Sequence, residues 1–369
     1  MNYFRDLLKN IDKTLLILPV AFAAISVLII GSTSYDQGFQ ITRDITVQLI
    51  AYLLGAVAII VVLLIDYKTF ESMERILYLG SIALLIAVYI PGLGKEQFGA
   101  HGWINLGPLD FQPSEIVKIT FILCFSNYLT RRRDALMTFK GIVMAGLYFM
   151  PLVLMILIEP DLGNAVVLFV IAAVMIYAAG VKYKLFAQIA GAGILAMPII
   201  YRFMESHQKD RIDAFLNPEN LSLPGNYQVW NSKVAIGSGG LLGKGLFEGT
   251  QKSLKFLPVQ ESDFIFSVIV EELGFIGGAL IVGLYTIFLY RLVKIADNAK
   301  DLYGSLIVIG ILAMFAFQIF ENIAMTMGIM PVTGITLPFI SYGGSSVLTN
   351  MIALGLVLNV GIRSKVINF

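Results

Sequence analysis

The stretch Val47-Gln-Leu-Ile-Ala-Tyr-Leu-Leu-Gly-Ala-Val-Ala-Ile-Ile-Val-Val-Leu-Leu-Ile65 decides the fold class. It carries no charged residue and exceeds the roughly 18 apolar residues that indicate a membrane-spanning helix. Of the 369 residues, 57% are hydrophobic and only 14% are charged. A soluble domain carries about a quarter charged residues, so a soluble core of this size would lack the polar surface to cover it. The composition therefore predicts a polytopic membrane protein and excludes a soluble enzyme, a disulfide scaffold and a disordered tail.

Further apolar runs on both sides of this stretch predict an all-α protein with ten membrane-spanning helices. A membrane β-barrel is not expected, because barrel strands alternate apolar and polar residues whereas these runs are continuously apolar. The connections are short except for 202–262, which is too long for a simple connection and should carry structure of its own. We expect a single domain over 1–369. The predicted spans are 15–32, 47–65, 76–94, 113–130, 141–158, 164–181, 185–201, 264–290, 303–330 and 347–361.

The Lys and Arg residues of the connections predict the orientation. With the N-terminus in the cytoplasm, the inside segments hold sixteen of these residues, whereas the four short outside connections hold only Arg43 and Lys95. Long loops follow this rule only weakly. The count over the short connections places the long segment 202–262 on the outside. Both termini are therefore expected in the cytoplasm. The net charge of +1 gives no reason to expect a nucleic-acid partner.

Charged residues at the ends of the predicted spans are candidates for a functional site. A charge at bilayer depth costs about 2.5–3.5 kcal/mol, so such groups usually face the protein interior and have a role there. Glu115 and Lys118 are three residues apart at the start of 113–130, where they share a helix face. A local ion pair explains them as well as a functional role does. Asp161 precedes 164–181, where an ordinary helix N-cap is an equally good explanation.

Asp263 begins the span 264–290, directly after the long outward segment. Aspartate is common at helix starts, but this one follows a segment rich in glycine and in basic residues, which can bind phosphate. The glycine cluster 237–245 could bring backbone donors to an anion, although it does not match the phosphate-binding loop pattern. Glu271 and Glu272 lie roughly 12–14 Å deeper along a helix, which favours a buried structural network.

The closing stretch 331–346 has little charge and too many helix breakers to be a helix. Such backbone at membrane depth must be buried in protein or line a wet cavity. Together with other motifs, it resembles the SEDS family, the RodA, FtsW and SpoVE polytopic proteins of bacterial cell-wall synthesis. One departure is His101-Gly102, where many members carry a basic pair. The start of the chain resembles RodA more than FtsW. The motifs lie at 103–107, 112–118, 159–163, 227–228, 235–243, 263–266, 271–274 and 331–345.

The resemblance implies a peptidoglycan glycosyltransferase that polymerises lipid II into glycan strands at the outer leaflet of the bacterial inner membrane. It also implies a class B penicillin-binding protein as the transpeptidase partner, within an elongation or division complex. Asp263 of the Asp-Phe-Ile-Phe motif corresponds to the essential catalytic residue. An α-linked lipid donor that yields a β-linked glycan implies a single inversion, so one carboxylate base suffices without a covalent intermediate.

We therefore expect Asp263 to accept the proton of the acceptor hydroxyl while another carboxylate helps to position it. Departure of pyrophosphate requires positive charge, either from basic side chains or from a divalent cation such as Mg²⁺ or Mn²⁺. The candidate catalytic residues are Asp263, Glu115 and Asp161, and the candidate substrate-binding residues are Lys118, Arg211, Lys233, Lys244, Gln228 and Ser345.

A transporter that flips lipid-linked precursor is the competing hypothesis. Its polar path through the membrane would consist of Lys118, Glu271, Glu272 and Glu321. Transport requires access from both faces, but the predicted cytoplasmic loops are short and most functional-looking residues lie outside. A scaffold that only activates its partner is a third interpretation, and it would leave the outward charges without a chemical role.

Overall fold

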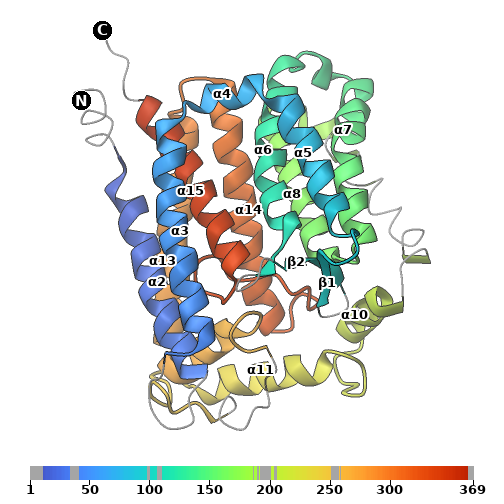
Figure 1. Ribbon diagram of the computed structural model, residues 1–369. Coiled ribbons are helices and arrows are strands. Elements are labelled where there is room, and N and C mark those ends of the chain that lie inside the picture. Colours follow the sequence, from blue (N-terminus) through green and yellow to red (C-terminus); the bar gives the residue numbers. More distant parts are fainter. Residues whose placement is uncertain are drawn as a thin grey trace.

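The computed structural model describes residues 11–33, 41–97, 100–105, 110–185, 187–188, 191, 201–202, 206–250, 257 and 259–364. These residues form a bundle of long helices with a small sheet and a helix lying across one end (Figure 1). The elements are α2 (Lys13–Thr33), α3 (Arg43–Leu64), α4 (Tyr67–Ser72), α5 (Glu74–Ala87), β1 (Gly94–Gln97), β2 (Ala100–Asn105), β3 (Asp110–Phe111), α6 (Pro113–Arg131), η1 (Ala135–Met137), α7 (Phe139–Ile158), α8 (Leu162–Ala178), α10 (Ser206–Leu216), α11 (Asn226–Ser238), α13 (Ile265–Asp297), α14 (Leu302–Thr326) and α15 (Gly344–Ser364).

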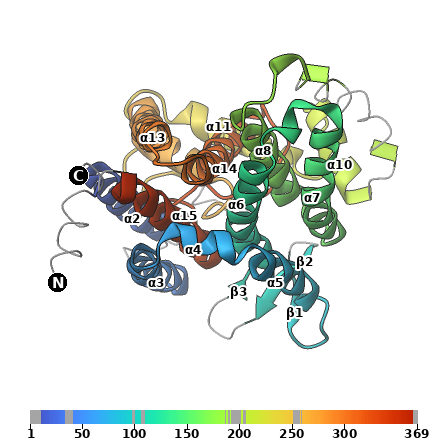
Figure 2. The same ribbon diagram turned by 90° about the horizontal axis from the view of Figure 1, so that it is seen from above.

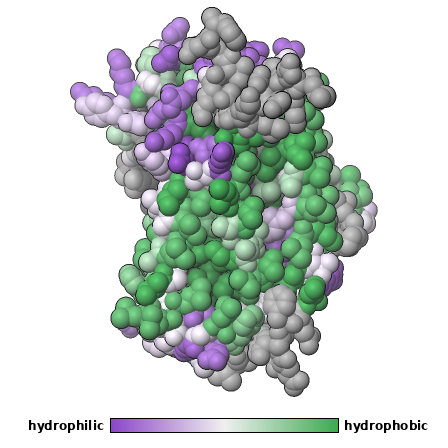
Figure 3. Space-filling view, turned by 90° about the vertical axis from the view of Figure 1, so that its left-hand side faces the viewer, coloured by the Kyte–Doolittle hydropathy of each residue, from purple (hydrophilic) through white to green (hydrophobic). Residues whose placement is uncertain are grey.

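Within the described ranges, six helices are long and apolar enough to cross a membrane, namely α2, α3, α7, α13, α14 and α15. The shorter helix α8 is also apolar. Hydrophobic side chains form a broad band along the face of the molecule that Figure 3 shows, with polar side chains toward its two ends. These features confirm the prediction of a multi-pass membrane protein.

Each predicted span except the seventh overlaps a helix. The seventh span, 185–201, lies largely outside the described residues. The third predicted span, 76–94, extends beyond the end of its helix, because α5 ends at Ala87 and a turn follows at Pro91 and Gly92. Proline disfavours a helical residue before it, and Gly92 has a φ of +89°, so the helix cannot continue to residue 94.

The protein also contains a three-stranded antiparallel sheet with the order β1-β2-β3. The prediction of an all-α protein is wrong in this detail. Gly94 pairs with Ile104, and Ile104 pairs in turn with Phe111 on the other side. An ion pair of 3.0 Å between Lys95 Nζ and Asp110 Oδ2 joins the outer strands. The sheet leads directly into α6 and lies at the same end of the bundle as α11 (Figure 1).

The two C-terminal helices lie in the middle of the bundle. Seen along the helix axes, α15 lies between α3 and α6, while α14 lies between α13 and α8 (Figure 2). α15 packs closely against α3 at Gly55. A methyl group on Gly55 would lie 2.6 Å from the Met351 side chain, so a small residue is needed at this position. α2 begins and α15 ends at the end of the bundle opposite to α11 (Figure 1).

The long helix α13 is interrupted at Gly274, whose φ of +69° and ψ of −169° are not helical. The glycine-rich loop after α11 occupies this break: Lys244 N donates to Glu271 O at 3.0 Å, and Phe275 N donates to Gly240 O at 2.9 Å. A methyl group on Gly274 would lie 2.3 Å from Gly243 N. The glycine cluster therefore allows two backbone segments to meet, and its described donors bond protein carbonyls.

Candidate active site

Asp263 lies in a turn two residues before α13 begins. Its main-chain nitrogen donates to Val259 O at 3.1 Å, and its Oδ1 accepts a hydrogen bond of 2.8 Å from Ser262 Oγ. The side chain is half-buried. Burial raises the pKa of Asp263 to about 6, while Ser262 and Arg211 lower it and Glu261 adds a smaller upward shift. A carboxylate with this pKa can act as a general base near neutral pH.

The non-helical segment 331–343 lies directly against Asp263. Asn322 of α14 donates its Nδ2 both to Asp263 O at 3.1 Å and to Ile335 O at 2.8 Å. A methyl group on Gly334, whose φ is +78°, would lie 3.7 Å from Asp263 Oδ2. Further carbonyls of the segment accept hydrogen bonds from buried or half-buried side chains of the bundle, namely Ser26, Gln48, Tyr52 and Tyr285. Residues 337–341 are thus buried in protein, whereas Pro331 and Val332 line a cavity, so both of the environments expected for this backbone occur.

Thr333 joins this segment to two charged residues. Its main-chain oxygen accepts a hydrogen bond of 3.4 Å from Arg211 Nη1 of α10. Its hydroxyl donates to Glu321, which is buried in α14. Asp263 and Arg211 both interact electrostatically with Glu321. The three charged groups thus form one cluster at the end of the bundle that carries α11.

A cavity of about 350 Å³ lies between α10, α11 and the segment that follows α14. Arg211, Gln228 and Lys233 line it, together with the single acidic residue Asp210 and apolar side chains. Lys233 Nζ lies 5.9 Å from the centre of the Trp230 ring. Three of the six candidate substrate-binding residues, from the helices α10 and α11 of the long segment, thus line the same cavity.

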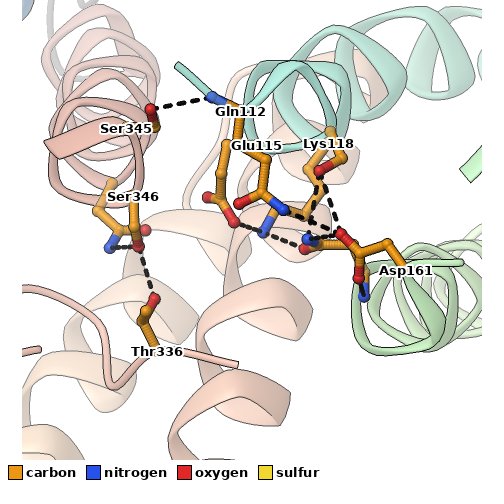
Figure 4. A network of polar contacts seen from close by, with 10 residues as sticks. Gln112, Glu115, Lys118, Asp161, Thr336, Ser345 and Ser346 are labelled. Atoms are coloured by element: carbon orange, nitrogen blue, oxygen red, sulfur yellow. Dashed lines mark hydrogen bonds and ion pairs between the residues drawn. The ribbon is translucent and has the colours of Figure 1, made fainter. Parts of the chain in front are cut away.

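Asp161, Glu115 and Lys118 belong to a second polar cluster, at the starts of α6 and α8 (Figure 4). Lys118 Nζ donates to Glu115 Oε1 at 2.7 Å and to Asn164 Oδ1 at 2.9 Å. Asp161 caps α8 by accepting from Asn164 N at 3.0 Å, and it accepts from Gln112 Nε2 at 3.0 Å. Lys118 is fully buried. The local ion pair and the N-cap are therefore both present.

The two clusters meet through the backbone around Thr333. A methyl group on Gly163, two residues after Asp161, would lie 2.9 Å from Thr333 O. That oxygen is also the acceptor of Arg211, and Gly334 lies against Asp263. The Asp161 turn and Asp263 therefore both pack against this segment, at neighbouring residues.

The remaining two candidate residues bond to other parts of the protein. Lys244 Nζ lies 2.7 Å from Glu271 Oε1, next to the break in α13. Glu271 and Glu272 are fully buried, and Glu272 accepts a hydrogen bond from Ser32. Ser345 Oγ donates to Asp110 O at 2.9 Å and accepts from the main-chain nitrogen of Gln112, the residue directly before α6, at 3.1 Å (Figure 4).

The comparisons with known proteins agree with this architecture. The sequence model of a family described as cell cycle protein, named for FtsW, RodA and SpoVE, matches residues 12–366. The chain belongs to this family. A probable peptidoglycan glycosyltransferase FtsW from Trichlorobacter lovleyi is 37% identical over 373 residues, covering 97% of this chain and 95% of its own length. The peptidoglycan glycosyltransferase RodA of Treponema pallidum is 32% identical over 428 residues, covering 96% and 98%.

A solved structure that belongs to a study of how a peptidoglycan synthase complex coordinates polymerization and crosslinking has the same fold. It is 28% identical to this chain, with a TM-score of 0.82 over 97% of this chain and 99% of its own. Because relatives named FtsW and RodA both match over nearly the whole chain, the closer likeness to RodA stays a prediction.

Several polar residues of this FtsW/RodA/SpoVE family member were not identified from its sequence. Asn322 and Thr333 form hydrogen bonds within the Asp263 cluster, and Asn164 forms one within the Lys118 cluster. An uncharged amide or hydroxyl in an apolar run gives no clear signal in the sequence. Glu159 lies in the motif 159–163 and is one of the charged residues at the ends of the predicted spans, but its sequence position indicated no role of its own. It is fully buried, and neither of its carboxyl oxygens has a hydrogen-bond partner in the described part of the chain. Burial raises its pKa to about 8, and Asp161 adds to the shift.

The described residues do not by themselves form a metal site. Among them, no group of three or more His, Cys, Asp and Glu side chains could hold an ion. Mg²⁺ is usually bound by one or two carboxylates together with substrate phosphates. The described side chains therefore do not fit a metal cage made of protein alone.

Proposed function

We propose that this chain is a peptidoglycan glycosyltransferase that polymerises lipid II into glycan strands. The observation that carries the proposal is the half-buried Asp263, whose raised pKa suits a general base, beside Arg211 and a cavity lined by cations. Membership of the FtsW/RodA/SpoVE family and the names of the matched relatives support it. The whole chain would act as one domain, because the site draws on segments from α6 to α15.

In the proposed reaction, Asp263 removes the proton of a sugar hydroxyl on the acceptor. The hydroxyl oxygen then bonds to the anomeric carbon of the donor, and the bond from that carbon to pyrophosphate breaks with inversion. Polyprenyl pyrophosphate leaves with the electron pair, and the proton on Asp263 passes to water. One base is sufficient, since the donor carries its own leaving group.

The leaving pyrophosphate requires positive charge, and we assign this role to Arg211 and Lys233. Both line the cavity beside the Asp263 cluster, and Arg and Lys are the usual partners of phosphate. Lys118 and Lys244 each have a carboxylate partner at 2.7 Å, so we assign them structural roles. Gln228 would bond the sugar in the cavity, and Glu115, Asp161 and Ser345 would hold the surrounding backbone.

The orientation proposed from the charged residues places α11, Asp263 and the cavity at the outer face of the bacterial inner membrane. Both chain termini would then lie in the cytoplasm. In support, α2 begins and α15 ends at the end of the bundle opposite to α11 (Figure 1). A lipid-anchored sugar at the outer leaflet could reach Asp263 from this side, while the polyprenyl chain stays in the bilayer.

We further propose that the chain works with a class B penicillin-binding protein, which crosslinks the new strands, among other proteins of an elongation or division complex. The support is the likeness to a structure from a peptidoglycan synthase complex. No nucleic-acid partner is proposed. A divalent cation, Mg²⁺ or Mn²⁺, remains a prediction, and the phosphates of the substrate would supply most of its ligands.

The positions of the buried charges argue against the competing transporter. Lys118, Glu271 and Glu321 lie five or six residues from the ends of their helices nearest to α11. At 1.5 Å per residue this is a depth of about 8–9 Å, so in the described part of the chain they do not form a path across the bundle.

The test is a gel assay of the purified full chain with labelled lipid II and its transpeptidase partner, with and without a chelator. Glycan ladders are expected, and their loss on chelation would establish the metal requirement. Absence of ladders from correctly folded protein, together with movement of lipid II across vesicle membranes, would establish the transporter instead.

A further inference from the structure

A second cavity, of about 300 Å³, is lined by the last turns of α13, so it lies at the opposite end of that helix from Asp263. It is enclosed by the start of α2 and the ends of α13 and α15. Two basic residues one turn apart on α13, Arg291 and Lys294, line it, together with the polar side chains of Asn298 and Ser364. None of these residues belongs to the site described above.

The charge in this cavity is incompletely balanced. Asp12 is the single acidic residue among the described residues that line it, and its Oδ1 already caps α2 by accepting from Thr14 N at 2.9 Å. Its Oδ2 lies 3.6 Å from Arg291 Nη1, which is a long ion pair. Lys294 Nζ lies 4.7 Å from the centre of the Tyr290 ring. In the described part of the chain, two cations thus face one carboxylate in this cavity, and this net positive charge suits an anion.

The surroundings of the cavity are apolar in the direction of the bilayer. Ile295, Leu358 and Ile362 form part of its wall. About one turn deeper, α13 exposes Ile287, and α2 exposes Ile17, which has 65% of its surface accessible. An occupant could therefore place a charged group between the helix ends and apolar chains along α2 and α13.

We propose that this cavity binds the phosphodiester headgroup of an anionic phospholipid, with the acyl chains along α2 and α13. Basic pockets between membrane helices at the cytoplasmic face are suited to such headgroups, and each nearby Lys or Arg adds to the attraction. A soluble phosphate is also an anion, but it has no acyl chains to pack against the exposed apolar side chains. The bound lipid ties together the ends of α2, α13 and α15.

The experiment uses the full chain in neutral detergent or in phosphatidylcholine nanodiscs. Phosphatidylglycerol is titrated in while the melting temperature is recorded and bound lipid is counted by native mass spectrometry. Phosphatidylglycerol should raise the melting temperature, and additional phosphatidylcholine should not. In the double variant Arg291→Gln/Lys294→Gln, the apparent affinity for phosphatidylglycerol should fall at least about tenfold.

The matched control is Lys140→Gln/Lys182→Gln, which removes two exposed positive charges at the same end of the bundle, from the start of α7 and the residues after α8. It should keep the wild-type response. Lys294→Gln alone keeps the pair between Arg291 and Asp12 and decides the matter if the double variant does not fold. A wild-type response in the Lys294 variant, or an equal loss in the control, would overturn the proposal, as would a full shift produced by inorganic phosphate alone.

Discussion

Arg211 Nη1 donates a hydrogen bond of 3.4 Å to the main-chain oxygen of Thr333. This bond joins α10, which belongs to the long segment between membrane helices, to the backbone that lies against Asp263. The same guanidinium lines the cavity and lowers the pKa of Asp263. Arg211 therefore connects the proposed pyrophosphate site with the proposed base.

Replacing Arg211 by Gln should lower the rate of lipid II polymerisation by about a hundredfold, because a preorganised cation at the leaving group is lost. Without the cation, the pKa of Asp263 should rise, so the acid limb of the rate profile should move to higher pH. The matched control is Lys209→Gln on the same helix, whose Nζ bonds Arg202 O at 3.2 Å. Equal effects of the two substitutions, measured as pH–rate profiles, would contradict the role of Arg211.

Glu159 should make the protein less stable as the pH rises. Its pKa is raised to about 8 in the folded state and is near 4.3 in an unfolded chain. Between these values the folded state binds more protons, so its stability falls by at most about 1.4 kcal/mol per pH unit. The advantage of Glu159→Gln in melting temperature should therefore grow from pH 5 to pH 8. An advantage that does not change with pH would show that Glu159 is not protonated in the fold.

Gly102 offers a separate test of the same carboxyl. A methyl group at this position would lie 3.6 Å from Glu159 Oε2, and apart from the chain neighbours of Gly102 no other atom of the described residues would lie within 4 Å. Gly102→Arg should therefore supply the missing cation and stabilise the protein at pH 8 by about 1–3 kcal/mol. Gly102→Leu serves as the control of size. The gain should vanish when Gly102→Arg is combined with Glu159→Gln, and a gain that persists would rule out the ion pair.

Lys118→Met should destabilise the protein by about 3–5 kcal/mol, because it leaves the buried Glu115 without its cation. Adding Glu115→Gln should restore part of that loss, since no charge then remains to be compensated. The measurement is chemical or thermal unfolding of the single and double variants. If Glu115→Gln destabilises the Lys118→Met variant as much as it destabilises the wild-type protein, the two residues do not act as a pair.

Gly274→Ala should cost about 2 kcal/mol or more, because its φ of +69° is strained for alanine and the new methyl group would lie 2.3 Å from Gly243 N. Gly283→Ala on the same helix is the matched control. Apart from the neighbouring backbone of α13, no described atom would lie within 4 Å of the new methyl group, and alanine favours a helix more than glycine does. Unfolding should thus show a loss for the first variant and a small gain for the second. Equal outcomes would mean that the docked loop does not require glycine.

The bundle could be predicted because apolar runs such as 47–65 have to be buried in lipid or protein, and in lipid a helix satisfies its own backbone. Hydropathy alone did not show where 76–94 ends, since Pro91 and Gly92 stop the helix while the residues stay largely apolar. The sheet escaped prediction because its strands are too short to show alternation.

For the candidate site, the motifs identified Asp263 through resemblance, and the charges identified the pair Glu115 and Lys118. The partners of the basic residues depend on tertiary packing. Lys244 bonds Glu271 because the glycine-rich loop docks at the break in α13. Arg211 reaches the segment beside Asp263 because α10 folds back onto the bundle. Local sequence patterns do not contain either contact.

The most direct test of the central claim compares Asp263→Asn with the wild-type protein in polymerisation of purified lipid II over a range of pH. The wild-type rate should rise through pH about 6, where the raised pKa of Asp263 places its loss of a proton. The variant should lose at least about a hundredfold in rate while its folding and partner binding remain intact. A variant that makes glycan strands at the wild-type rate would contradict the assignment of Asp263 as the base.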